Sequence, residues 1–163
     1  MPVVTCQNCK KNWLMSNREL QLLFYGELPV CSSKCLVQFI KNSPKTEENN
    51  SYCSHTGDLG GNIWSEIVRM MFKSRFEAKI AEILYENQIK FEYEQYLFHV
   101  GTTIYVPDLY LPEYDMFLEV KGAWGVGSKN KLAQFFNIYP STKLTLIPWV
   151  VGEGLIEQEN PFI

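Results

Sequence analysis

The sequence lacks any long apolar run, and this absence limits where the chain can reside. No window of its 163 residues approaches the 18 or more apolar residues of a membrane-spanning helix. The residues from Met1 to Trp13 include Cys, Asn, Gln and Lys, where a secretory signal would have an apolar core. We therefore expect a protein of the reducing cytoplasm that has no membrane partner.

An excess of positive charge is absent as well. The formal net charge is -3, so any nucleic-acid binding would depend on local clusters of Lys and Arg and not on the field of the whole protein. Apolar side chains are plentiful, at 46% of the residues, which is enough for a real hydrophobic core. The length suits one domain, alone or with a small accessory module.

Five cysteines are present, and an odd number in a reducing compartment favours thiolate metal ligands over a disulfide framework. Four of them form two close pairs, Cys6 with Cys9 and Cys31 with Cys35. This is the spacing with which four thiolates surround a tetrahedral Zn²⁺ ion. A block of about 35 residues cannot bury a core of its own, so the metal would supply folding free energy. The sequence predicts a structural zinc site.

The second cysteine pair, Cys-Ser-Ser-Lys-Cys running into Leu36–Ile40, resembles the treble-clef zinc fingers of the FCS or MYM type. In that type the last cysteine stands at the start of a short helix. Cys53 and His55 form a further Cys-X-His step that could add or replace a ligand, but we expect both to be free because four cysteines already close a site. The block is locally basic, which suits contact with a DNA backbone, and it could equally bind a partner protein or a second subunit.

Composition divides the chain into a four-cysteine finger (1–41), a linker (42–62) rich in Asn, Ser, Thr and Gly, and a second domain (63–163). In that domain, apolar spacing predicts a helix within 64–87, either one long helix or two with the second beginning at Ser74. Strands are expected at 90–98, 103–111, 115–121 and 143–151, and a helix at 129–139. Pro148 should cut the last strand or confine its later half to an edge. The fold class is mixed α/β (α+β).

The strand Met116–Lys121 carries the residues of greatest chemical interest. Period-2 alternation gives it one aliphatic face and puts Glu119 and Lys121 together on the other, roughly 7 Å apart, next to the strand that holds Asp108. Two carboxylates can hold one or two Mg²⁺ ions, because hard oxygen ligands suit that ion. A lysine amine can orient or deprotonate a water, or offset charge on a phosphate. These residue types suit phosphodiester hydrolysis.

Tyr105-Val106-Pro107-Asp108, eleven residues before Glu119-Val120-Lys121-Gly122, resembles the signature of the PD-(D/E)XK nuclease superfamily. The resemblance covers about 64–151 and implies a restriction-endonuclease-like core: a helix, a three-stranded antiparallel meander, a second helix and a further strand, with a central mixed sheet flanked by helices. It also implies a metal-dependent DNA endonuclease. Asp108 and Glu119 would bind Mg²⁺ (or Mn²⁺), and Lys121 would assist the water.

Two further sets of residues are candidates by the same resemblance. Many members have an acid on the first core helix, and Glu77 stands at that place, although it could serve only as the N3 partner of a Ser74 capping box. In related nucleases the helix after the signature touches the scissile phosphate. Lys131 and Gln134 share a face of this helix better than Lys129 and Lys131 do, and a solvated charged face is the alternative. Other residues near the signature have simpler interpretations. Trp124 lies in a loop that could reach the substrate or simply be flexible. Glu113 and Asp115 are expected in a solvated turn, and His99 at a hairpin end.

We therefore expect a nicking or structure-specific endonuclease of DNA repair, recombination or restriction, possibly phage-encoded. A double-strand cut by a chain with one site would imply a homodimer. The alternative is a non-catalytic zinc-finger module that binds nucleic acid or a partner through a nuclease-like core. That alternative is disfavoured because all three signature residues are present. A zinc-dependent hydrolase would need an open coordination position, which four thiolates close.

Overall fold

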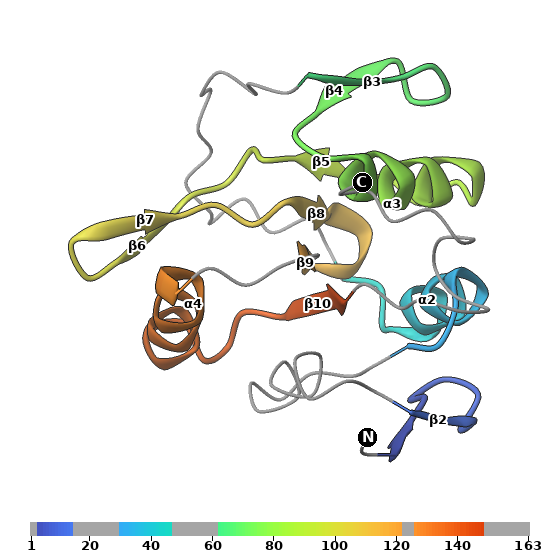
Figure 1. The fold of residues 1–163 in the computed structure, drawn as a ribbon, viewed down its shortest axis with the longest axis horizontal. Coiled ribbons are helices and arrows are strands. Elements are labelled where there is room, and N and C mark those ends of the chain that lie inside the picture. The colour runs from blue at the N-terminus through green and yellow to red at the C-terminus, as the bar shows by residue number, and fades with distance from the viewer. Residues whose placement is uncertain (1–2, 15–29, 47–61, 122–125, 149–163) are drawn as a thin grey trace.

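The computed structural model describes residues 3–14, 30–46, 62–121 and 126–148, and its fold combines α-helices with mixed β-sheets. Figure 1 shows a central sheet lying among the helices. The mixed α and β class expected from the sequence is confirmed. No helix within these four ranges has the length and apolar character needed to cross a membrane.

The central sheet has four strands in the order β10-β9-β8-β5. Antiparallel pairing joins β5 (Glu92–Tyr93) to β8 (Leu109–Leu111) and β8 to β9 (Met116–Lys121). β10 (Leu144–Pro148) pairs with β9 in parallel. A parallel neighbour requires a crossover connection, and α4 (Val126–Ile138) provides it.

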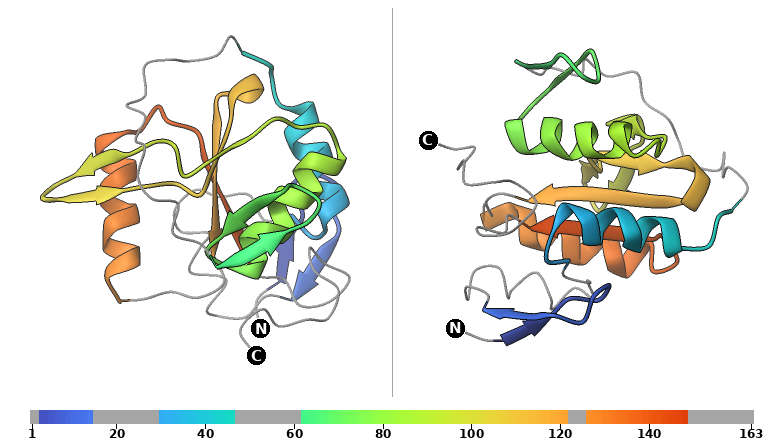
Figure 2. Two further views of the ribbon diagram at one scale, coloured as in Figure 1. Left: turned by 90° about the horizontal axis from the view of Figure 1, so that it is seen from above. Right: turned by 90° about the vertical axis from the view of Figure 1, so that its right-hand side faces the viewer.

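The two faces of the sheet pack against different helices, as the alternation of β9 predicts. Met116, Leu118 and Val120 join one apolar cluster with residues of α3 (Arg75–Glu86). Phe117, on the opposite face, joins a second cluster with residues of α4. In the left view of Figure 2 the sheet is seen between α4 on one side and α2 and α3 on the other.

The cysteine-bearing block shares its core with the rest of the chain. It consists of the hairpin β1 (Val3–Thr5) and β2 (Asn12–Leu14) and the helix α2 (Ser33–Asn42). The buried residues of α2, Leu36, Val37 and Ile40, belong to the same apolar cluster as the buried side chains of α3. Unfolding of the block would therefore expose part of the core beneath α3.

The segment that follows α2 is attached to a 3-10 turn between β8 and β9. Lys45 forms an ion pair of 2.8 Å with Glu113, and the backbone N–H of Thr46 donates to the Glu113 carbonyl at 3.0 Å. This turn spans Pro112–Tyr114. The remainder of the predicted linker, 47–61, lies outside the described residues.

The prediction of a helix in the first part of 64–87 is wrong. A hairpin of β3 (Ile63–Ser65) and β4 (Met70–Phe72) occupies that part, and α3 begins only after Ser74, the predicted helix start. The apolar residues Ile67 and Met71 suggested a helical face by their spacing, but both are exposed. The buried side chains are Phe72 and Ser65, one from each strand, so burial follows the strand pairing.

Two predicted strands are shorter than expected because the backbone cannot continue them. The strand expected at 103–111 is divided into β7 (Thr103–Tyr105) and β8 by Pro107, which has no N–H for a ladder hydrogen bond. The strand expected at 90–98 is reduced to β5, because Glu94 adopts a left-handed φ of 47°. β6 (Phe98–Val100) then pairs with β7 as a hairpin that turns at Gly101, where φ is 61°.

The hairpin of β6 and β7 projects beyond the sheet on the side of α4 (Figure 1). Aromatic packing holds its base: the ring of Phe98 lies 5.0 Å from that of Phe135 and 5.0 Å from that of Tyr139. The hydroxyl of Tyr139 also donates to the carbonyl of His99, an exposed residue of β6 near the hairpin end. The hairpin and α4 together form one side of the candidate site.

The C-terminal elements differ little from the predictions. α4 begins three residues earlier than the expected start at 129 and ends one residue before 139. Among the described strands β10 lies at the edge of the sheet, as expected for a strand that contains Pro148, which cannot donate a ladder hydrogen bond. Residues 149–151 of the predicted strand lie outside the described residues.

Candidate functional site

Three acids, in or directly beside three neighbouring strands, lie in one row across the sheet. At Leu109, β8 pairs with both β5 and β9, and the next residues along the three strands are Glu94, Asp108 and Glu119. The backbone N–H of Glu94 donates to the Asp108 carbonyl at 2.8 Å and so continues the ladder by one step. Strand pairing thus brings together carboxylates that are far apart in the sequence.

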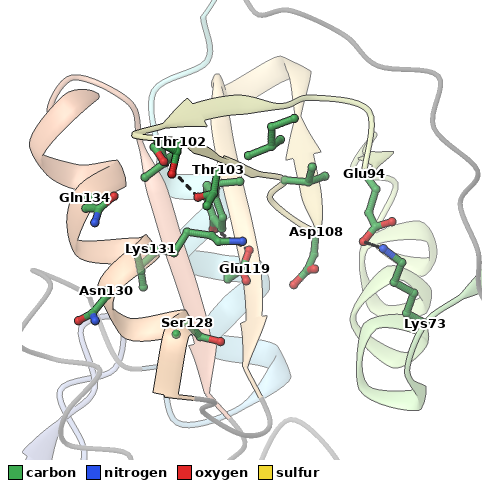
Figure 3. Close-up of a pocket in the computed structure, with 16 residues that line it drawn as sticks. Lys73, Glu94, Thr102, Thr103, Asp108, Glu119, Ser128, Asn130, Lys131 and Gln134 are labelled. Carbon is green, nitrogen blue, oxygen red and sulfur yellow. Dashed lines mark hydrogen bonds and ion pairs between the residues drawn. The ribbon is translucent and has the colours of Figure 1, made fainter.

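These acids line a cavity of about 760 Å³ between the sheet, the β6–β7 hairpin and α4. Figure 3 shows Thr102 and Thr103 of the hairpin on one side and residues of α4 on another. The side chain of Lys131 extends from α4 toward Glu119 (Figure 3). The cavity therefore combines acidic groups with a basic side chain and several neutral hydrogen-bonding groups.

Backbone and side-chain hydrogen bonds hold the two signature acids. Oδ2 of Asp108 accepts from the backbone N–H of Val120 at 2.6 Å. Glu119 is only 2% exposed, and its Oε2 accepts from the hydroxyl of Tyr105 at 2.7 Å. Hydrogen bonds to a carboxylate are among the stronger ones in proteins, so both acids are held in defined orientations.

Glu77 contacts the Ser74 cap of α3 and also a tyrosine of β5. Ser74 caps α3 by accepting from the Glu77 backbone N–H at 3.1 Å, and its hydroxyl donates to Glu77 Oε1 at 2.8 Å. Ser74 is therefore confirmed as the N-cap of α3, with Glu77 as its N3 partner. The other carboxylate oxygen, Oε2, accepts from the hydroxyl of Tyr93 at 2.5 Å. Burial, and then the bond to Glu77, raise the pKa of Tyr93, so this hydroxyl remains a donor at neutral pH.

The carboxylates of Glu77, Glu94 and Asp108 are close enough to share an ion. One oxygen of each lies within 4.8 Å of the others. Carboxylate oxygens are hard ligands of the kind that Mg²⁺ and Mn²⁺ take in proteins, so the trio could hold a divalent metal ion. Glu119 lines the same cavity.

Glu94 and its partner Lys73 are site residues that the sequence analysis missed. The Lys73 ammonium lies 2.7 Å from Glu94 Oε1, and both residues line the cavity. In the sequence, Glu92 and Glu94 alternate with Phe91 and Tyr93, which indicates a solvated strand face. Only the turn of the backbone after β5 puts Glu94 beside the other acids, and no local pattern marked that turn.

The other predicted site residues divide into three groups. Lys131 and Gln134 line the cavity, and Lys129 is not among its lining residues. Lys121 belongs to β9 opposite Pro148, but its side chain and the whole of Trp124 lie outside the described residues. The turn acids are occupied away from the cavity, since Glu113 pairs with Lys45 and Asp115 accepts from Tyr110.

The four N-terminal cysteines converge on one point. Their sulfur atoms all lie within 4.8 Å of one another, with Cys31 at 3.5 Å from Cys9 and 3.6 Å from Cys35. All four are free cysteines, and none of them forms a disulfide. Four sulfur donors suit a tetrahedral soft-metal site, so the cluster could hold an ion such as Zn²⁺. Cys53 and His55 lie outside the described residues.

Burial and local hydrogen bonds shift the pKa values of two thiols in this cluster in opposite directions. Burial would raise the pKa of Cys6, but backbone N–H groups of Cys9, Cys31 and Asn8 outweigh it and lower that pKa to about 6. Burial and the neighbouring thiols raise the pKa of Cys31 to about 12. Cys6 is therefore a thiolate at neutral pH, the form that binds metal.

Comparison with known proteins adds no relative. No family model, no curated protein and no solved structure matches the chain. The chemistry of the site must therefore be argued from its own geometry.

The arrangement is chemically suited to an anionic substrate that shares a metal ion with the protein. Glu77, Glu94 and Asp108 could provide oxygen ligands, and Glu119 lines the same cavity. Lys131 extends from α4 and brings a positive charge toward Glu119. A divalent cation in such a site can polarise a bound oxygen and lower the pKa of a bound water. A phosphate group is the kind of ligand that both features accommodate.

Proposed function

We propose that the protein is a metal-dependent DNA endonuclease that hydrolyses phosphodiester bonds in this cavity. The observation that supports the proposal most is the pairing of β8 with β9, which sets Asp108 beside Glu119 on the wall of the cavity. The PD-(D/E)XK resemblance requires that these two acids act on one metal ion. Side chains facing apart would have been incompatible with it.

The order of elements supports a restriction-endonuclease-like core. α3 precedes the antiparallel meander β5-β8-β9, and α4 and the parallel strand β10 follow it. This is the order that the resemblance implies. The β6–β7 hairpin is then an insertion within the meander.

In this proposal Asp108 and Glu119, with Glu77 from α3, hold Mg²⁺ or Mn²⁺, which supplies an activated water and stabilises charge on the phosphoryl oxygens. Val120 and Tyr105 keep the two signature acids oriented toward the cavity. The remaining contributions come from donors that face the substrate.

Lys131 and Gln134 offer an ammonium and an amide to phosphate oxygens from the wall opposite the sheet. Lys121 would orient or deprotonate the attacking water, a role that depends on the sequence motif alone. Lys129 and Trp124 remain candidates for contact with DNA outside the cavity. The basic groups act locally, because a net charge of -3 gives no general attraction for DNA.

The cysteine cluster would hold a structural Zn²⁺ in an FCS- or MYM-like finger. Four thiolates fill a tetrahedral coordination sphere and leave no position for a substrate, so this ion would stabilise the fold and take no part in hydrolysis. The basic residues of the finger suit contact with the DNA backbone or with a partner.

The biological setting follows only from the class of enzyme. We propose a cytoplasmic nuclease, nicking or structure-specific, of DNA repair, recombination or restriction, possibly encoded by a phage. One site in each chain cuts one strand, so a double-strand cut would require two chains, as in a homodimer.

The test is cleavage of supercoiled plasmid, branched DNA and single-stranded DNA with Mg²⁺ or Mn²⁺. We expect the parent protein to cut at least one of these, and Glu119→Ala and Lys121→Ala to lower the rate by about a hundredfold or more. Glu113→Ala is the matched control, because this acid lies outside the cavity. Binding of DNA without cleavage under every condition would contradict the proposal and would support a non-catalytic nucleic-acid-binding module.

A further inference from the structure

The ion pair between Lys73 and Glu94 stands at the edge of the proposed metal site. The Glu94 side chain is 7% exposed, whereas that of Lys73 is 49% exposed, although their charged groups are 2.7 Å apart. The backbone of Lys73 is anchored, because its N–H donates to the Tyr93 hydroxyl at 3.0 Å. The lysine therefore has a fixed origin and a long side chain that can turn outward to water.

The surroundings of Glu94 concentrate negative charge. Its carboxylate has those of Glu77 and Asp108 within 4.8 Å, so three acids occupy a volume in which their mutual repulsion is strong. Neutral donors, from Ser74, Tyr93 and the Val120 backbone, hold Glu77 and Asp108. Lys73 brings one full positive charge to the trio through Glu94.

We propose that Glu94 is a further ligand of the cation site and that the Lys73 ammonium is its exchangeable counter-ion. A divalent cation among Glu77, Glu94 and Asp108 would displace Lys73, because it carries two charges into direct contact with the oxygens. The half-exposed ammonium returns to water at small cost. The identification of the ion as Mg²⁺ or Mn²⁺ rests on the proposed function.

The backbone turns at Glu94, where φ is 47°. This turn ends β5 and carries the Glu94 side chain to the other two acids. If the strand continued past Tyr93, Glu94 would instead have a negative φ.

The exchange predicts opposite effects of the two partners on cation affinity. The Lys73 ammonium competes with Mn²⁺ for the Glu94 carboxylate, and it lowers the apparent Mn²⁺ affinity by the fraction of time that it is bound there. Lys73→Met should therefore tighten Mn²⁺ binding by about threefold. Glu94→Gln removes a charged ligand and should weaken binding by about tenfold or more. Lys79→Met is the matched control, because Lys79 is also 49% exposed and pairs with an acid outside the trio, Glu82. It should leave the affinity unchanged.

Calorimetric titration of Mn²⁺ into the full chain, with the cysteine site first saturated with Zn²⁺, measures these affinities without DNA. The double variant separates exchange from simple repulsion. If Lys73 acts through Glu94, Lys73→Met should have no effect in the Glu94→Gln background, whereas long-range repulsion would persist there. Thermal denaturation of each variant shows that the fold is retained.

A crystal structure with Mn²⁺ adds a direct observation. We expect anomalous density in contact with the Glu94 carboxylate and the Lys73 ammonium turned away from it. The inference is overturned if Glu94→Gln binds Mn²⁺ as tightly as the parent, or if the effect of Lys73→Met is the same in both backgrounds.

The two proposals can fail separately. Affinities that shift as expected in a protein that cuts no DNA would leave the exchange standing and remove the nuclease function. Cleavage that depends on Glu119, combined with unchanged Mn²⁺ affinities in the Lys73 and Glu94 variants, would support the nuclease function and remove the exchange.

Discussion

The hydroxyl of Tyr105 donates a 2.7 Å hydrogen bond to Oε2 of Glu119, and both residues are buried. Tyr105 is the last residue of β7, whereas Glu119 belongs to β9. The projecting hairpin and the central sheet are thereby connected at a proposed metal ligand. The position of the hairpin is therefore part of the geometry of the site.

Tyr105→Phe should lower both stability and activity, since it removes this donor from a buried acid and changes the volume little. We expect the free energy of unfolding to fall by about 1 to 2 kcal/mol. The kcat of DNA cleavage should fall by about tenfold with little change in KM. Urea denaturation and initial cleavage rates measure the two effects. Tyr139→Phe, which removes the more exposed bond to His99, is the control and should change both less.

The two roles of Glu77 can be separated by substitution. Ser74→Ala removes the cap of α3 and should cost about 1 kcal/mol of stability. Glu77→Gln keeps the Ser74 cap, because glutamine also serves at N3, but removes a charge from the acidic trio. We expect Glu77→Gln to lower Mn²⁺ affinity more than stability, as measured by calorimetry and urea denaturation. The reverse pattern would mean that Glu77 acts only as a cap.

Removal of the metal from the cysteine cluster should destabilise the whole chain. A ligand that binds only the folded state adds stability that is lost when a chelator removes it. We expect one Zn²⁺ per chain by atomic absorption and one cooperative thermal transition that moves to lower temperature with chelator. Cys9→Ser should lose the ion, while Cys53→Ser should retain it. Two separate transitions, of which only one responds to chelator, would contradict this prediction.

A core substitution in α2 tests the same connection without metal. Ile40 is fully buried in the cluster that also contains the buried residues of α3. Ile40→Ala should lower the free energy of unfolding by about 2 to 5 kcal/mol in a single transition. Val3→Ala, at a residue that is 65% exposed, is the control and should change it by about 0.5 kcal/mol or less. Urea denaturation followed by tryptophan fluorescence measures both.

Alkaline pH should weaken the fold through Tyr93. Burial and the bond to Glu77 raise its folded pKa above the unfolded value of about 10. The stability contributed by its proton is therefore complete below about pH 10 and is lost as the pH rises through and beyond that value. We expect the free energy of unfolding of the parent to fall more steeply above about pH 10 than that of Tyr93→Phe. Equal slopes in the two proteins would exclude this origin.

Local patterns predicted those parts of the fold in which a short segment determines its own conformation. The alternation of β9 and the Ser74 cap of α3 each follow from residues that are near neighbours in the chain. The hairpin at 63–72 was missed because Ile67 and Met71 have helical spacing, whereas burial of Phe72 against the core decided its structure.

The sequence by itself determined the candidate ligands: paired thiols at the N-terminus, and Asp108 and Glu119 on segments expected to be adjacent strands. Spacing along the chain is enough for this, because cysteine pairs and strand alternation are local properties. Only the tertiary structure decided that Glu94 and Lys73 join the acidic site and that the cysteine block shares a core with α3. Such contacts join segments that are far apart in the chain, so no local sequence pattern predicts them. They depend on packing of the completed sheet and helices.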